Sequence, residues 1–111
     1  MGQNLELDNT LLRYGQGYDH CYCFDPNSNA LTQAATLFHP KSGRKMEVFT
    51  TELAMQLYTA NHLAPPFASH AAICLETQGY PDSPNHPHFP TAVIAPGEEY
   101  RSTTQYKFTI A

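Results

Sequence analysis

Glu76 stands out in this 111-residue sequence because of the residues on either side of it. It follows the apolar run 73–75 and precedes a segment rich in Gly and Pro, where the chain must turn and could line the rim of a site. A carboxylate at the end of an apolar strand is costly to bury unless it has a partner or a task. Two interpretations remain open: an ion pair with Arg44 or Arg101, or a functional carboxylate.

Metal binding is a second kind of chemistry that the residue types allow. His20, Cys21 and Cys23 form one cluster, and His86 and His88 form another. The first cluster lacks a second ligand pair at the spacing of a zinc finger, and the second flanks a proline in a Pro-rich segment, so we expect no metal site. The odd number of cysteines indicates free thiols in a reducing compartment, and a cytoplasmic protein is the simplest expectation.

Length and charge exclude several classes of protein. A chain of 111 residues is one domain at most, with a modest core. The formal net charge of −4, with six Lys and Arg residues, argues against nucleic-acid or anionic-membrane partners. No apolar run approaches the roughly 20 residues that span a bilayer, and the first residues show neither a basic start nor an apolar signal core.

The elements that must position these side chains are predicted to be strands. Apolar and polar residues alternate in most of the segments between turn formers, so the predicted class is all-β. Segment 40–43 is a turn that joins two strands into a hairpin. A helix competes with a strand over 51–60, and we favour the strand; segment 1–16 is expected to be irregular, with at most a short strand. The predicted strands cover 21–24, 30–39, 44–51, 55–60, 73–76 and 100–110.

Four motifs in a fixed order carry a resemblance to a known family: 17–20 (GYDH), 39–44 (HPKSGR), 73–85 (ICLETQGYPDSPN) and 96–100 (PGEEY). Together they resemble the C-terminal third of the aldose 1-epimerases, or galactose mutarotases, over nearly all of the chain from about Tyr14 onward. The resemblance implies a twisted antiparallel β-sandwich of the galactose mutarotase type. Residues 1–111 are then a single, partial domain of that kind.

The resemblance also implies a reaction and three site residues. Mutarotases interconvert the α and β anomers of free aldohexoses such as galactose or glucose, which needs a paired acid and base and no metal or other cofactor. Glu76 matches the catalytic base of the family. Asp19 matches the carboxylate that binds sugar hydroxyls, and Gln56 matches an amide that contacts the substrate.

Simpler roles compete with these assignments. Asp19 could satisfy backbone N–H groups after a glycine turn, and Gln56 alone carries almost no functional signal. The general-acid histidine of the family and a second substrate-binding histidine lie upstream of this chain's first motif, and none of its six histidines has the matching context. We therefore expect a chain that self-associates or is complemented by an N-terminal part, and a sugar-binding protein without catalytic activity is the alternative function.

Overall fold

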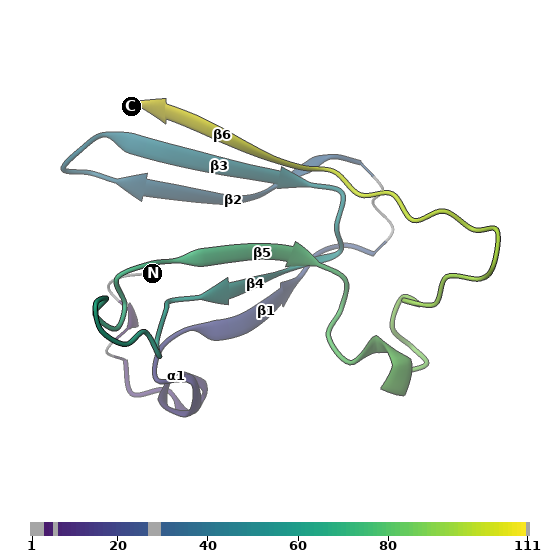
Figure 1. The fold of residues 1–111 in the computed structure, drawn as a ribbon, viewed down its shortest axis with the longest axis horizontal. Coiled ribbons are helices and arrows are strands. Elements are labelled where there is room, and N and C mark those ends of the chain that lie inside the picture. The colour runs from purple at the N-terminus through teal and green to yellow at the C-terminus, as the bar shows by residue number, and fades with distance from the viewer. Residues whose placement is uncertain (1–3, 6, 27–29, 111) are drawn as a thin grey trace. The chain divides into compact units, whose positions relative to one another are not determined.

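The computed structural model describes residues 4–5, 7–26 and 30–110, and in this part of the chain the structure is nearly all β (Figure 1). The predicted all-β class is confirmed. The helices are α1 (Thr10–Gly15) and the 3-10 helix η2 (Ser83–Asn85), and among the described residues no helix is long and apolar enough to cross a membrane. The strands are β1 (Asp19–Cys23), β2 (Thr32–His39), β3 (Arg44–Thr50), β4 (Ala54–Tyr58), β5 (Cys74–Gln78) and β6 (Thr104–Ile110).

Contacts between residues group the chain into two compact units. The first unit consists of Met1–Tyr22 and Met55–Glu76, and the second consists of Cys23–Ala54 and Thr77–Ala111. Each unit has its own buried residues, so each is described by itself below. That the whole chain forms one mutarotase-like domain stays a prediction.

The first unit contains most of a three-stranded sheet in the order β1-β4-β5. The arrow of β4 runs against those of β1 and β5, so the sheet is antiparallel (Figure 1). On β4, Met55 and Leu57 are buried while Gln56 and Tyr58 are half-buried, which is the period-2 alternation of a strand. The prediction of a strand in place of a helix is therefore confirmed here.

The helix α1 corrects the expectation of an irregular segment over 1–16, of which residues 1–3 and 6 lie outside the described part. The Asn9 side chain caps the helix, accepting hydrogen bonds from the backbone N–H groups of Leu11 at 2.9 Å and Leu12 at 3.4 Å. Gln16 ends it in the left-handed conformation. Leu12 is buried at 8% exposure and anchors the helix, so one capping residue and one apolar side chain suffice for this short element.

The second unit is built on an antiparallel sheet in the order β2-β3-β6. The predicted hairpin across 40–43 is confirmed, because His39 pairs with Arg44 and the register continues to Thr32 opposite Thr50. One face of this sheet carries three rows of paired residues that are apolar except for His39 and Arg44, and Val48 in the face is fully buried. The three rows are Ala35–Val48–Tyr106, Leu37–Met46–Phe108 and His39–Arg44–Ile110.

β6 is shorter than the predicted strand 100–110, because it begins at Thr104, which pairs with the last residue of β3. Upstream of Thr104 no β3 residue is left for a ladder, and Thr103 bonds instead to Thr51, through its N–H to the hydroxyl and its carbonyl to the backbone N–H. The Tyr100 hydroxyl donates a hydrogen bond to Glu52, which raises the pKa of Tyr100. One backbone hydrogen bond and two side-chain contacts thus take the place of the ladder over 100–103.

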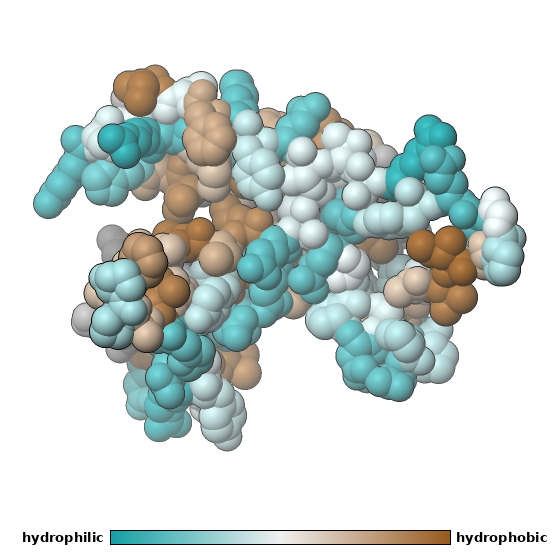
Figure 2. Space-filling view, in the orientation of Figure 1, coloured by the Kyte–Doolittle hydropathy of each residue, from teal (hydrophilic) through white to brown (hydrophobic). Residues whose placement is uncertain are grey.

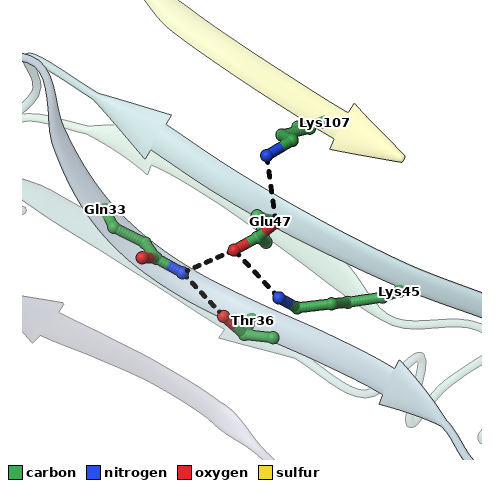
Figure 3. Close-up of polar contacts among 5 residues, drawn as sticks. All are labelled: Gln33, Thr36, Lys45, Glu47 and Lys107. Carbon is green, nitrogen blue, oxygen red and sulfur yellow. Dashed lines mark hydrogen bonds and ion pairs between the residues drawn. The ribbon is translucent and has the colours of Figure 1, made fainter. Parts of the chain in front are cut away.

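The opposite face of this sheet carries a polar cluster that centres on Glu47 (Figure 3). Its carboxylate accepts from the Lys45 ammonium at 3.0 Å and from the Gln33 amide at 3.3 Å, and the Lys107 ammonium lies 3.7 Å away. The hydrogen bond from Lys45, aided by the nearby Lys107 charge, lowers the pKa of Glu47 below its ordinary value of 4.5. The ionised carboxylate therefore links all three strands of the sheet.

We predict that Glu47→Gln lowers the thermal stability of the chain at neutral pH and that this difference disappears in acid. A lowered folded-state pKa means that the stabilisation is fully present above pH 4.5 and is lost as the pH falls through the lowered value. Melting temperatures of both proteins across this range test the prediction, with salt reducing the difference because the cluster faces solvent. A difference that stays constant down to strongly acidic pH would contradict it.

Candidate sugar site on the first unit

Asp19 and Gln56, two of the three site residues expected from the sequence, lie in contact. They stand on the neighbouring strands β1 and β4, and the Gln56 amide Nε2 donates a hydrogen bond to Oδ1 of Asp19 at 2.7 Å. Asp19 is exposed and Gln56 is half-buried. The alternative role of Asp19 as an acceptor for backbone N–H groups is not seen among the described residues, since its recorded carboxylate partner is a side-chain amide.

The Asp19–Gln56 pair has hydrogen-bonding capacity left over. Within the described part of the chain, the two side chains make no hydrogen bond other than the one that joins them. This bond uses one carboxylate oxygen of Asp19 and one amide hydrogen of Gln56. A carboxylate accepts at two oxygens, and an amide both donates two hydrogens and accepts at its oxygen. The pair can therefore accept from and donate to neighbouring hydroxyl groups of a ligand at the same time.

The position of Asp19 is set by a buried polar network that the sequence analysis missed. The Asn61 side chain, 5% exposed, donates to the carbonyls of Gly15 at 2.7 Å and Tyr18 at 3.0 Å and accepts from the Thr59 hydroxyl at 2.6 Å. That hydroxyl also accepts from the backbone N–H of Tyr18 at 3.0 Å. The residue directly before Asp19 is thus fixed to the end of β4, which carries Gln56.

Gly17 allows the backbone to pass close to the Asn61 side chain. Its φ of 141° is a conformation that side chains rarely adopt, and a Cβ atom built on it would lie 2.3 Å from Oδ1 of Asn61. Glycine at this position therefore lets the chain take a tight path into β1. No single stretch of sequence reveals its partner, because Asn61 lies more than forty residues downstream.

Glu76 stands on β5, which is the other neighbour of the central strand β4. It lies in the middle of this strand and not at its end, because Thr77 and Gln78 continue the ladder before Gly79. This corrects the predicted boundary. Glu76 is exposed, and among the described residues of the first unit it has no hydrogen-bond or ion-pair partner. Arg101, one of its suggested partners, forms an ion pair with Glu99 at 2.8 Å.

Several histidines make local side-chain contacts. Nδ1 of His20 accepts from the backbone N–H of Asp19 at 2.9 Å, and Nδ1 of His70 lies 2.9 Å from the carbonyl oxygen of Thr59. In the second unit Nε2 of His86 contacts Asp82 at 3.0 Å, and the His86 and His88 rings lie 5.7 Å apart. Within the described ranges no group of three or more His, Cys, Asp or Glu side chains is arranged to hold a metal ion.

Comparison with known proteins adds to this geometry. The sequence profile of the aldose 1-epimerase family matches residues 1–107. The chain belongs to the aldose 1-epimerase family. It is 42% identical to the galactose mutarotase of Mus musculus over 103 residues and 40% identical to that of Homo sapiens over 103 residues, covering 86% of this chain in each case. It is 34% identical to the aldose 1-epimerase of Escherichia coli K12 over 102 residues, covering 84% of this chain.

This aldose 1-epimerase chain spans about 30% of the length of each of these relatives. The resemblance seen in the four sequence motifs is thereby confirmed, and so is its restriction to about a third of the family fold. The structure brings Asp19 and Gln56 into contact and places Glu76 on the strand that follows in the sheet. The roles assigned to the three side chains stay predictions.

We predict that Gly17→Ala lowers the free energy of unfolding by about 1–3 kcal/mol, because alanine is strained at this φ and its Cβ displaces Asn61. Gly79→Ala is the matched control: nothing lies within 4 Å of a Cβ there, so we expect a change within about 0.5 kcal/mol. Urea unfolding of the three proteins measures both values. Equal losses in the two variants would show that the Gly17 contact does not stabilise the fold.

Proposed function

We propose that this aldose 1-epimerase chain binds free aldohexoses such as galactose or glucose and interconverts their α and β anomers, with Glu76 as the general base. The Asp19–Gln56 pair is the observation that carries the proposal. It presents a carboxylate and an amide on adjacent strands, and the residue before Asp19 is fixed by the buried Asn61. The galactose mutarotases to which the chain is similar support the choice of sugar.

In the proposed complex the Asp19–Gln56 pair orients the sugar. Neighbouring ring hydroxyls donate to the carboxylate, and the amide donates to or accepts from the next hydroxyl. A hydrogen bond to a charged acceptor is stronger than one between neutral groups, so Asp19 supplies most of the binding energy of the pair. Gln56 keeps the carboxylate in one orientation, which limits the entropy lost when the sugar binds.

Glu76 performs the proton transfer in this account. It removes the proton from the C1 hydroxyl while an acid protonates the ring oxygen, and the bond between C1 and the ring oxygen breaks to give the open-chain aldehyde. After rotation about C1–C2, the hydroxyl formed from the ring oxygen attacks the other face of C1. The deprotonated acid takes the proton of this hydroxyl, and Glu76 gives its proton to the C1 oxygen. Glu76 suits this role because it is exposed beside β4 and without an ion-pair partner in the described part of the first unit.

The acid is the part of this reaction for which the described residues offer no matching group. By resemblance, the general-acid histidine of the family lies upstream of Gly17, and this chain spans about 30% of its relatives. One positioned proton donor contributes about 10²- to 10⁴-fold to the rate, so we expect activity below that of a full-length relative by that factor. This favours a second candidate, a sugar-binding chain that does not accelerate anomer exchange.

Polarimetry of freshly dissolved α-D-galactose tests the proposal directly. We expect the purified chain to accelerate relaxation of the optical rotation above the buffer rate, and Glu76→Gln to remove that acceleration while the sugar still binds. Glu99→Gln is the matched control, because Glu99 lies in an exposed ion pair with Arg101, and we expect it to leave the rate unchanged.

The three possible results separate the candidates. Acceleration that survives in Glu76→Gln would refute Glu76 as the base. Saturable galactose binding at the buffer rate of relaxation would support the sugar-binding alternative. Absence of both binding and acceleration would refute the proposed function for the isolated chain.

A further inference from the structure

The strands β1 and β4 are antiparallel neighbours whose register is fixed by two backbone hydrogen bonds. The Thr59 N–H donates to the Tyr18 carbonyl at 3.0 Å beyond one end of the pair, and the Phe24 N–H donates to the Leu53 carbonyl at 2.8 Å beyond the other. Residues joined in this way lie opposite each other in an antiparallel ladder. Both strands have five residues, and counting inward from either bond gives the same pairing. The first residue of β1 therefore lies opposite the last residue of β4.

Tyr58 is the residue that this register places opposite Asp19. The pair adjoins a hydrogen-bonded pair, so it is of the non-hydrogen-bonded kind, in which the Cα atoms are about 4.5 Å apart and the side chains lie closest. Gln56, two residues before Tyr58, projects from the same side of β4 and contacts Asp19 at 2.7 Å. Asp19, Gln56 and Tyr58 thus share one face of the sheet.

The Tyr58 ring is held at both of its ends. Its Cβ end belongs to β4, and its hydroxyl oxygen accepts a hydrogen bond from the backbone N–H of His62 at 3.1 Å. His62 directly follows Asn61, whose buried side chain is itself anchored by three hydrogen bonds. A ring that is fixed before a ligand arrives loses little conformational entropy on binding. Tyr58 is half-buried, so part of its side chain stays accessible to a ligand.

A carboxylate, an amide and an aromatic ring on one face of a sheet form a combination that suits a sugar ring. Polar groups bind the hydroxyls at the rim of a pyranose, while its C–H bonds form an apolar face that packs on the negative face of an aromatic ring. Figure 2 shows hydrophilic residues, in teal, over β5, and apolar residues, in brown and tan, at the loop before this strand. Both kinds of group that a pyranose needs therefore occur close together around this sheet.

We propose that Tyr58 is a sugar-stacking residue, whose ring packs against the C–H face of galactose and favours galactose over glucose. This inference rests on the proposed function of the same site. In galactose the axial 4-hydroxyl leaves the C–H bonds at C3, C4 and C5 together on one side of the ring. In glucose the 4-hydroxyl is equatorial and the C–H bond at C4 points to the opposite face, so less apolar area meets the Tyr58 ring.

The ring distinguishes the two sugars by shape, whereas the Asp19–Gln56 pair treats them alike. Both sugars offer neighbouring equatorial hydroxyls at C2 and C3 to the carboxylate and the amide. From the usual strength of aromatic contacts in proteins, we expect galactose to bind about threefold to tenfold more tightly than glucose. Tyr58 is then the residue that determines specificity, and the polar pair sets the affinity common to both sugars.

Nuclear magnetic resonance titrations of the full chain with each sugar measure this preference. Tyr58→Phe keeps the ring and removes only the oxygen that accepts from His62, so we expect the ratio of the two dissociation constants to stay as it is. Tyr58→Leu replaces the ring by an aliphatic side chain, and we expect the ratio to fall to about one. Tyr14→Leu is the matched control, because Tyr14 is 82% exposed on α1, and it should leave the ratio unaltered.

Saturation-transfer measurements on the unaltered chain cover the case in which Tyr58→Leu fails to fold. We expect irradiation of the tyrosine ring protons to reach the protons on C3, C4 and C5 of galactose most strongly, since these protons lie against the Tyr58 ring in the proposed complex.

Three results would overturn the stacking role. The first is equal affinity of the unaltered chain for galactose and glucose. The second is a preference for galactose that survives in folded Tyr58→Leu. The third is saturation that reaches all ring protons of galactose evenly. Each of them requires that galactose binds, so each refutes the role of Tyr58 and leaves the proposed function standing, whereas the absence of galactose binding refutes both.

Discussion

The buried amide of Asn61 is the interaction on which the rest of the first unit depends. It binds the carbonyls of Gly15 and Tyr18, so it joins the end of α1 and the start of β1 to the residue that follows β4. An unpaired amide at this depth would be costly, which is why its oxygen is also satisfied by Thr59. The network leaves no room for a side chain at Gly17 and places Asp19 within hydrogen-bonding distance of Gln56.

Much of this arrangement could be predicted from the sequence, and the physical reasons for success and failure differ from element to element. Strands β3 and β4 were predictable because Met46 and Val48, and then Met55 and Leu57, alternate with polar or half-buried neighbours. The helix α1 was missed because it is short and its signal is one capping residue, Asn9. The start of β6 was misplaced because alternation continues through Tyr100, while the ladder depends on where β3 ends.

The candidate site shows the same division between local and distant information. Asp19, Gln56 and Glu76 were found through motifs that match a family, and the contact between the first two is a fact of the sheet that no motif contains. Thr59 and Asn61, which support Asp19, carry no signal in their own stretch of sequence, because their partners lie more than forty residues away. Polar networks of this kind are specified by tertiary structure alone.

The sheet of the second unit has a polar cluster on one face and apolar side chains on the other. Glu47 links β2, β3 and β6 on one face, where three neighbouring polar side chains contact its carboxylate. The other face buries Val48 completely and leaves Phe108 largely exposed.

The central claim is that the Asp19–Gln56 pair binds the hydroxyl groups of an aldohexose. The most direct measurement is a nuclear magnetic resonance titration with D-galactose that follows the side-chain amide resonances of Gln56 in the ¹⁵N-labelled chain. The account predicts saturable shifts of both Gln56 amide protons, and their loss in Asp19→Ala. Galactose binding that leaves the Gln56 amide unmoved, or shifts that are unchanged in Asp19→Ala, would contradict it.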